Sequence, residues 1–298
     1  MMINNANYYS LENAKNFMSA SQFKAFLECE AKTVAEINGD FTRDSSTAIL
    51  IGSYVDAWFE GTLDSFKESH PEIFLKSGGL KADFVQADTI IRRVSSDEQF
   101  MKYMSGEKQK IFTGTIENVP FKGKLDSYHA GKCIVDLKVM RDFESIWKNG
   151  RKLPFIEAWG YDIQGAIYQE LVYQETGEKL PFIICAVTKE KVPDLTIISI
   201  PQERLDYCLE LVKANAPHFQ DLKYAEIQPE RCEKCDYCKL TKKLAGIIDY
   251  RDLNPELFID KPVQTTIASV TEKPNISEKP HKKHKKAKKK HKKIVIKI

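Results

Sequence analysis

Residues 123–138 read GKLDSYHAGKCIVDLK, and we expect them to form one β-hairpin. The surrounding run from Lys110 to Met140 alternates as strands do, and His129-Ala130-Gly131-Lys132 supplies the turn. With the turn centred on Gly131, Asp126 faces Asp136 directly, with Cβ atoms roughly 5 Å apart. Lys138 lies two residues further on, on the same face as Asp136.

This hairpin brings together the groups that phosphodiester hydrolysis needs. Asp126 and Asp136 repel each other at such a distance, but a divalent cation between them turns the repulsion into a binding site, since Mg²⁺ takes carboxylate oxygens at about 2.1 Å. The metal and Lys138 would then cancel the negative charge that gathers in the transition state. The alternative is that the carboxylates are solvated charges or caps, because an Asp-x-Lys triplet is common.

Two further segments supply polar groups. Asp56 interrupts the apolar run from Ile49 to Phe59 and needs a partner, either the metal on the hairpin or solvent at a helix N-terminal turn. In the segment that begins at Trp159, three side chains share one helix face: Tyr161, Gln164 and Tyr168. Such a face suits contacts with a DNA backbone, or it is an ordinary interfacial stripe.

Five elements in order resemble the PD-(D/E)xK nuclease superfamily, in particular its RecB-like and exonuclease VIII (RecE)-like members of phages and prophages. They are the entry helix Ser19–Cys29, the segment Gly52–Asp56, the G-x-x-D element Gly123–Asp126, the (D/E)-x-K strand Ile134–Lys138 and the Q-x-x-x-Y motif Gln164–Tyr168. Asp56 stands where the family more often has His.

The resemblance implies a role for each residue. Asp126, Asp136 and Lys138 are expected to be catalytic, and Gln164 and Tyr168 to position the substrate. The expected ligands of Mg²⁺ or Mn²⁺ are Asp56, Asp126, Asp136 and the backbone carbonyl of Leu137. The implied fold is α/β, a restriction-endonuclease-like core with a mixed sheet flanked by helices.

A second metal site is indicated by the run Cys232-x-x-Cys235-x-x-Cys238, whose spacing recurs in iron–sulfur and zinc sites. The resemblance nominates Cys29 as the fourth ligand and a [4Fe-4S] cluster as the cofactor, with Zn²⁺ as the alternative. Cys133, Cys185 and Cys208 lie in apolar contexts and are expected to be core residues.

The periodicity also predicts the remaining elements. Helices are expected at Ala20–Ile37, Ser53–Glu60, Ala82–Val94, Phe155–Glu175 and Glu203–Phe219, and two further strands at Pro181–Thr188 and Leu195–Ser199.

Charge is distributed unevenly along the 298 residues. Residues 279–298 contain eleven lysines and no acid, so with a formal net charge of +3 the preceding residues carry −8. We expect a nuclease domain at residues 1–250, including the cysteine cluster, and at 251–298 a linker and a disordered Lys/His-rich tail that either tethers DNA or has no role. No apolar run suits a membrane span and no export signal is seen, so the expected location is cytoplasmic.

The expected function is that of a metal-dependent exodeoxyribonuclease. By kinship it would resect linear double-stranded DNA from the 5′ end for recombination, with a single-strand annealing protein as partner and a possible homo-oligomer. Two alternatives remain within nucleases, a cluster-bearing single-strand exonuclease and an accessory subunit of a helicase-nuclease. A third alternative is a noncatalytic nucleic-acid-binding metal protein.

Overall fold

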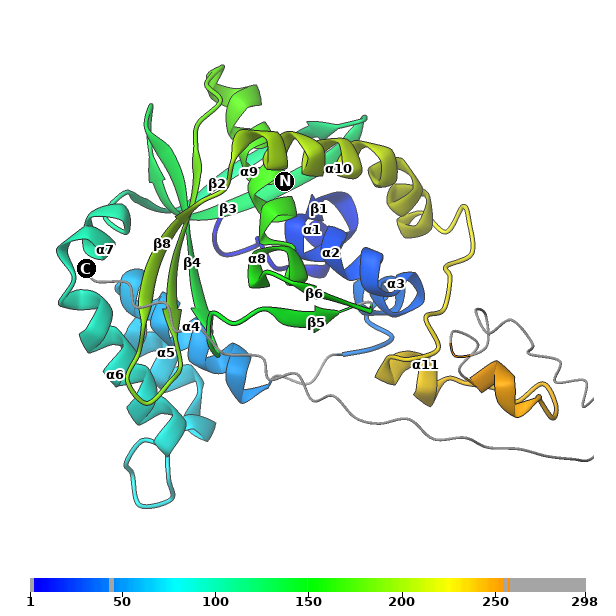
Figure 1. Ribbon diagram of the computed structural model, residues 1–298, viewed down its shortest axis with the longest axis horizontal. Coiled ribbons are helices and arrows are strands. Elements are labelled where there is room, and N and C mark those ends of the chain that lie inside the picture. Colours follow the sequence, from blue (N-terminus) through cyan, green and yellow to red (C-terminus); the bar gives the residue numbers. More distant parts are fainter. Residues whose placement is uncertain (1–2, 43–45, 149, 254–256, 258–298) are drawn as a thin grey trace, which may run out of the picture. The chain divides into compact units, whose positions relative to one another are not determined.

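A computed structural model describes residues 3–42, 46–148, 150–253 and 257 (Figure 1). The chain divides into two units, Met1–Lys243 and Leu244–Ile298. This division falls before the boundary at residue 250 that the sequence suggests. The Lys/His-rich run at 279–298 lies outside the described residues.

The first unit is built on one mixed six-stranded sheet in the order β1-β3-β4-β7-β8, with β2 paired to β3. The strands are β1 (Met18–Ser19), β2 (Glu107–Ile116), β3 (Val119–His129), β4 (Cys133–Met140), β7 (Phe182–Thr188) and β8 (Leu195–Ser199). The pairs β1–β3 and β4–β7 are parallel, and the other pairs are antiparallel. The predicted α/β fold with a mixed sheet is confirmed.

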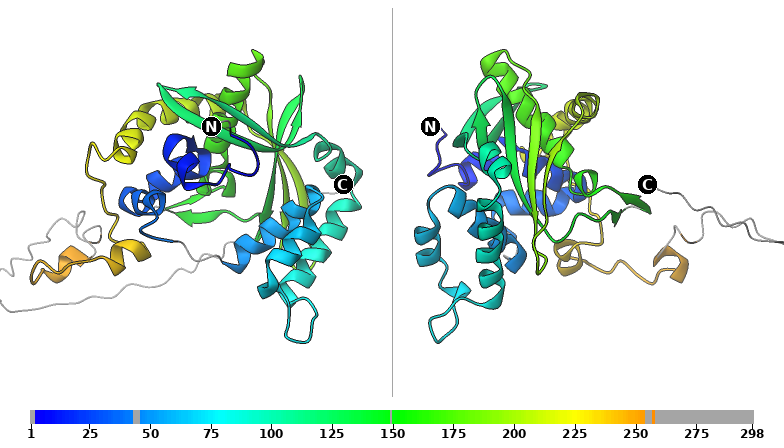
Figure 2. Two further views of the ribbon diagram at one scale, coloured as in Figure 1. Left: turned by 180° about the vertical axis from the view of Figure 1, so that it is seen from behind. Right: turned by 60° about the vertical axis from the view of Figure 1, so that its left-hand side comes forward.

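Helices cover both faces of this sheet (Figures 1 and 2). One layer contains α4 (Thr47–Phe59), α5 (Leu63–Ser69), α6 (Ala82–Ser95) and α7 (Glu98–Tyr103), and the other contains α2 (Ala20–Glu28), α9 (Tyr161–Thr176) and α10 (Gln202–Lys223). The remaining elements are α1 (Leu11–Asn16), α3 (Glu30–Asn38), α8 (Phe155–Ala158), α11 (Asp236–Leu240), the hairpin β5 (Ile146–Lys148) with β6 (Arg151–Leu153), and 3-10 helices at Pro71–Ile73 and Tyr250–Leu253.

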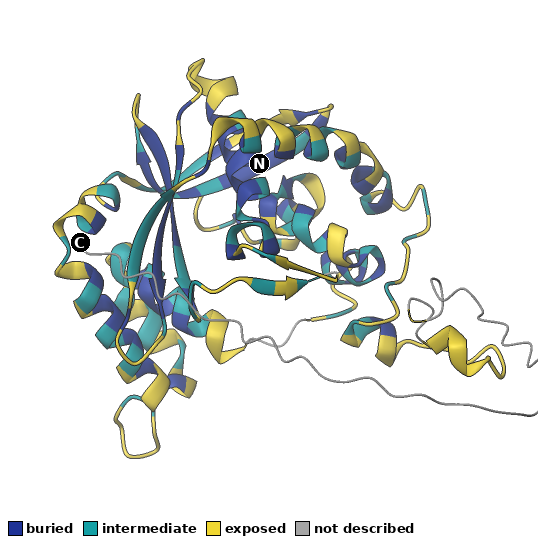
Figure 3. Cartoon of the chain, in the orientation of Figure 1, coloured by how far each residue is buried: buried dark blue, intermediate teal, exposed yellow. Residues whose placement is uncertain are grey.

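Alternation along β4 separates two hydrophobic cores. Figure 3 shows buried residues along the strands and on the helices that cover them. Ile134 packs into the core formed with α2, α9 and α10, while Val135 and Leu137 pack into the core formed with α4, α6 and α7. Asp136 and Lys138 therefore share the face of Ile134, toward α9.

Two long helices expected from periodicity are each broken once. The predicted helix Ala20–Ile37 stops at Cys29, whose backbone is extended (φ −166°, ψ 109°) between α2 and α3. The predicted helix Phe155–Glu175 is interrupted at Gly160, which adopts φ 62° before α9. A Cβ at Gly160 would lie 2.8 Å from Cδ of Lys24, so this turn needs glycine for space as well as for its dihedral angle.

The helix predicted at Ser53–Glu60 begins earlier, at Thr47, where the Ser46 hydroxyl accepts a hydrogen bond from the Ile49 backbone N–H. Cys133, Cys185 and Cys208 are buried, as expected. In the part of the chain that the structure describes, no helix combines the length and the apolar character needed to cross a membrane.

Candidate active site and cysteine cluster

The two strands of the predicted hairpin separate at its carboxylates. The expected register holds for Ser127↔Val135 and for the two pairs nearer the turn, and Asp126 and Asp136 would be the next pair. The ladder ends before them, and Oδ2 of Asp126 accepts a hydrogen bond of 2.8 Å from the Leu137 N–H. A side chain thus replaces the backbone partner, and the strands are free to open into a pocket.

This pocket has a volume of about 190 Å³ and collects side chains from both helical layers. Its lining includes all seven residues that the sequence nominated at the hairpin site: Asp56, Asp126, Asp136, Leu137, Lys138, Gln164 and Tyr168. Asp56 lies in the second half of α4, so the alternative that placed it in a solvated N-terminal turn is wrong. Tyr161, Gln164 and Tyr168 share one face of α9, as expected. The centre of the Tyr161 ring lies 5.0 Å from the Lys138 ammonium, and Gln164 and Tyr168 line the pocket.

Asp136 is held from two sides. It is 2% exposed, its Oδ1 accepts a hydrogen bond of 2.7 Å from Nε2 of Gln164, and its Oδ2 forms an ion pair with Lys138. Burial favours the neutral form of Lys138, but the charges of Asp136 and Asp126 outweigh burial and raise its pKa above the ordinary value. Lys138 is therefore a fixed positive charge at neutral pH.

The surroundings of the other two carboxylates disfavour their ionised forms. Burial and the charge of Asp136 raise the pKa of Asp126 to about 6. Burial, followed by the charge of Asp126, raises the pKa of Asp56 well above its usual range. Carboxylates that resist ionisation together in one pocket are arranged for a cation that would neutralise them.

The donor set accordingly fits a hard divalent cation. Asp56, Asp126 and Asp136 offer carboxylate oxygens, and Glu60 lines the same pocket. Lys138 and Lys124 are the positive groups of the lining, so its acidic side chains outnumber its basic ones.

Sequence reasoning missed three side chains near this pocket. Nζ of Lys24 lies 3.4 Å from Oε1 of Gln164 and 5.2 Å from the centre of the Tyr161 ring, and burial lowers the pKa of Lys24 to about 8. The signal available was a lysine between Phe23 and Ala25 on the apolar entry helix. Tyr8 and Tyr9 also line the pocket, and no motif pointed to them.

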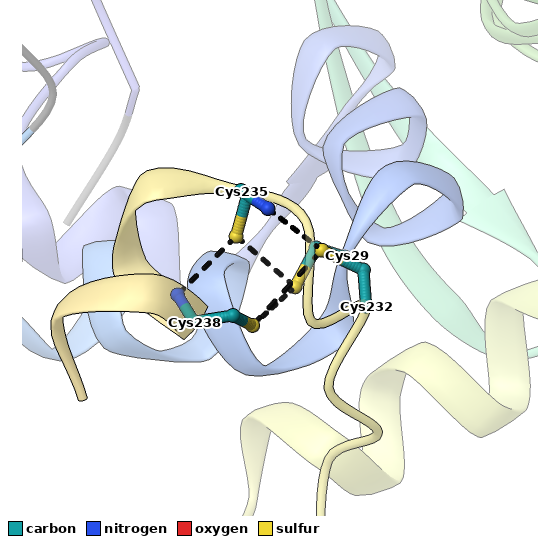
Figure 4. A group of neighbouring side chains, drawn as sticks. All are labelled: Cys29, Cys232, Cys235 and Cys238. Carbon is teal, nitrogen blue, oxygen red and sulfur yellow. Dashed lines mark hydrogen bonds between the residues drawn. The ribbon is translucent and has the colours of Figure 1, made fainter. Parts of the chain in front are cut away.

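The four predicted cysteines also come together in this unit (Figure 4). Their sulfur atoms all lie within 4.8 Å of one another, close enough for the four residues to hold one metal ion. Cys29 comes from the break between α2 and α3. Cys232 and Cys235 come from the segment that leads into α11, and Cys238 lies in α11 itself.

Local backbone geometry favours the thiolate form of one of these cysteines, Cys232. Burial opposes ionisation of Cys232, but N–H groups of Lys234 and Cys235, which lie 3.5 and 3.3 Å from its sulfur, lower its pKa to about 6. The Cys238 N–H also approaches the sulfur of Cys235, at 3.5 Å, but burial outweighs this contact and raises the pKa of Cys235. Thiolates are the ligand form, so the cluster can bind a metal.

Comparison with known proteins supports the same fold. The family described as "PDDEXK-like domain of unknown function" (DUF3799) matches residues 19–241. A presumptive exonuclease from Eubacterium rectale, solved as a crystal structure, is 46% identical with a TM-score of 0.82, and the match covers 85% of this chain and 98% of that one. The solved structure of SSO0001 is 13% identical over 70% of this chain and 90% of that one, and its TM-score of 0.29 is too low to place this chain with it.

No curated protein matches the chain. The family match spans the hairpin, the Gln164–Tyr168 segment and all four clustered cysteines, which confirms the resemblance to PD-(D/E)xK proteins drawn from the motifs. The chain belongs to the family of PDDEXK-like domains.

Proposed function

We propose that this protein is a metal-dependent exodeoxyribonuclease whose active site is the pocket between β3 and β4. The observation that carries the proposal is the convergence of Asp126, Asp136 and Lys138 where the two strands separate. Family membership and the relative from Eubacterium rectale support the reaction class.

Charge explains why a cation belongs in the reaction. The lining carries four carboxylates and two lysines, so a phosphodiester would be repelled unless a cation were bound first. Asp56, Asp126, Asp136 and the Leu137 carbonyl would hold Mg²⁺ or Mn²⁺, which would stabilise charge on the phosphate and lower the pKa of water.

The protein's own groups complete the chemistry. The Lys138 ammonium, kept charged by Asp136, can orient the attacking water and neutralise charge that develops on the phosphate. Gln164 fixes the Asp136 carboxylate through Oδ1, and Tyr168 lines the wall beside it. These positions agree with the substrate-positioning roles that the motif implies.

The finer activity is taken from the resemblance to exonuclease VIII: digestion of linear double-stranded DNA from the 5′ end, leaving 3′ single strands for recombination. The test uses linear duplexes labelled at the 5′ or the 3′ end, with a covalently closed circle as control, all in Mg²⁺. Early release of the 5′ label with an intact circle supports this polarity. Cleavage of the circle, or early release of the 3′ label, contradicts it.

For the cysteine cluster we propose zinc in place of the iron–sulfur cofactor that the family resemblance implies. The sulfur of Cys29 lies 3.6 Å from that of Cys238 and 3.7 Å from that of Cys235, the sulfurs of Cys232 and Cys238 are 4.0 Å apart, and all four lie within 4.8 Å of one another. Zn–S bonds of about 2.3 Å in a tetrahedron put sulfurs about 3.8 Å apart. The sulfur atoms of four cysteines that bind a [4Fe-4S] cluster would lie further apart, because each binds a different iron.

Metal analysis and an absorption spectrum of protein purified without oxygen test the assignment. About one zinc per chain in colourless protein supports it. Iron with broad visible absorption would establish a [4Fe-4S] cluster instead.

A further inference from the structure

The rim of the pocket carries an aromatic pair that neither the family match nor the proposed chemistry uses. Tyr8 and Tyr9 precede α1, outside residues 19–241, yet both line the pocket. Tyr8 is 5% exposed, whereas Tyr9 is 78% exposed. Their rings meet edge to face, with centres 5.0 Å apart and planes at 82°.

Strand β3 holds this pair in place through two lysines. A Cβ at Gly123 would meet Tyr168 of α9 at 2.9 Å, so Lys122 and Lys124, on either side of Gly123, point to the opposite face of the strand. There the buried Lys122 donates a hydrogen bond to the backbone carbonyl of Tyr8, and its ammonium lies 4.5 Å from the centre of the Tyr8 ring. The buried Tyr8 thus fixes the backbone from which Tyr9 projects.

Lys124 contacts the exposed ring and lies on the same strand as Asp126. Its ammonium lies 4.8 Å from the centre of the Tyr9 ring and 5.5 Å from that of Tyr8. Lys124 and Asp126 are two residues apart along β3, a rise of about 6.6 Å in a strand, and both line the pocket. That step is comparable with the separation of successive phosphates in a nucleic acid strand.

An exposed tyrosine needs no explanation in general. Tyr9 differs because it combines a fixed backbone, a cation over its ring and a place at the mouth of an acidic pocket. A flat hydrophobic ring beside a lysine matches a nucleotide, which offers a base to stack and a phosphate to pair.

We propose that Tyr9 and Lys124 form a nucleotide subsite next to the scissile phosphate, with the base stacked on Tyr9 and its phosphate paired with Lys124. This inference rests on the proposed function and adds a substrate preference to it. A base inside a duplex is already stacked on its neighbours, so the subsite selects a nucleotide that has left the helix. Frayed or single-stranded ends are therefore preferred over blunt paired ends.

Binding to a single-stranded oligonucleotide tests the subsite independently of cleavage. The measurements are made with Ca²⁺ in a cleavage-deficient Asp136→Asn background, with Tyr9→Ala, Tyr9→Phe or Tyr207→Ala added. Tyr207 is a matched control, since it is 63% exposed and has Arg204 at 5.3 Å from its ring centre, but it does not line the pocket. Tyr9→Ala should weaken binding roughly tenfold, while Tyr9→Phe and Tyr207→Ala stay within about twofold.

An abasic scan identifies the stacked base. Removing one base near the end of the oligonucleotide should weaken its binding to the Asp136→Asn protein. The same removal should not weaken binding further when Tyr9→Ala is also present. Unchanged binding by Tyr9→Ala, or abasic penalties that add to that variant, would overturn the subsite even if wild type cleaves DNA. No binding and no cleavage by wild type would overturn the proposed function together with the subsite.

Discussion

At the scale of single residues, the site depends on how one amide is oriented. Gln164 donates through Nε2 to Asp136, and its Oε1 faces the ammonium of Lys24. A cation on the oxygen side opposes rotation of the amide, because the flipped amide would put its NH₂ group against the ammonium and its oxygen against a carboxylate. We therefore expect Lys24 to affect the proposed reaction through Gln164.

Replacing Lys24 tests this positioning. Lys24→Met should lower kcat roughly twofold to tenfold with little change in KM, since the loss is one hydrogen bond to a residue that orients a catalytic group. The values of kcat and KM for Lys24→Met, Gln164→Leu and the double variant measure the energetic coupling between the two residues. If the two effects simply add, Lys24 acts elsewhere.

Much of this residue-level picture could be predicted. Asp126, Asp136 and Lys138 follow from strand alternation and one turn, because both patterns are local in sequence. Lys24, Tyr8 and Tyr9 could not be found in this way. Their importance arises from contacts with Gln164, Lys122 and Lys124, which lie far along the chain.

At the scale of elements, α9 must approach the sheet closely to bring Gln164 to Asp136. Gly165 makes this possible, since a Cβ there would lie 2.4 Å from Cδ1 of Phe182 in β7. Gly52 on α4 offers a contrast, because a Cβ there would meet no atom within 4 Å.

Alanine at these two helix positions should have opposite effects on the free energy of unfolding. Gly165→Ala should lower it by about 1–3 kcal/mol through overpacking. Gly52→Ala should raise it by about 0.5–1 kcal/mol, because alanine loses less backbone freedom on folding. Urea unfolding measures both, and destabilisation of similar size by the two variants would contradict the close approach of α9.

The end of α10 is attached to the N-terminal elements by Lys223. Its ammonium donates to the Phe17 carbonyl (2.9 Å) and to Oε1 of Gln22 (3.0 Å). Burial, assisted by the charge of Lys122, lowers its pKa to about 7. Between that value and the ordinary lysine value of about 10.4, the unfolded chain binds more protons than the native one, so this group makes stability rise with pH.

Lys223→Met should remove that contribution. Between pH 7 and pH 9, wild type should gain about 2 kcal/mol in unfolding free energy relative to Lys223→Met. Urea unfolding of both proteins at each pH supplies the comparison, in which titrations common to both cancel. Parallel pH profiles would show that Lys223 has no lowered pKa.

The presence of the long helices and of the strands could be predicted from the sequence, but the residues at which the helices end could not. The breaks at Cys29 and Gly160 interrupt segments whose apolar periodicity continues, because each is set by a distant partner: the other clustered cysteines for Cys29 and Lys24 for Gly160. Periodicity reports which face is buried and does not reveal such contacts.

At the scale of the whole molecule, the cysteine cluster joins the beginning of the folded unit to its end. Beside it, Glu30 of α3 accepts a hydrogen bond from the Glu230 N–H (2.8 Å), and its Oε1 lies within hydrogen-bond distance of Nε2 of His218 in α10 (2.7 Å). The returning segment buries little hydrophobic surface around Cys29, Ala31 and Cys238. Bound metal should therefore supply much of the stability of this closure.

Removing that metal should lower the melting temperature by at least about 5 °C. A zinc chelator in magnesium-free buffer is compared on wild type and Cys238→Ser by calorimetry. The variant should already melt low and should not respond further. An unchanged melting temperature of wild type after verified metal removal would contradict a structural role.

The most direct test of the central claim compares DNA degradation by wild type, Asp136→Asn and Asp206→Asn on end-labelled linear DNA, with Mg²⁺, Mn²⁺ or chelator. Asp206 is the control, since it also pairs with a lysine (Lys179, 2.6 Å) but is exposed and does not line the pocket. We predict metal-dependent degradation by wild type and Asp206→Asn, and a loss of at least about a hundredfold in Asp136→Asn with an unchanged fold. Near-normal activity of Asp136→Asn would remove this pocket from the chemistry, and wild type that binds DNA without degrading it would establish a noncatalytic DNA-binding protein.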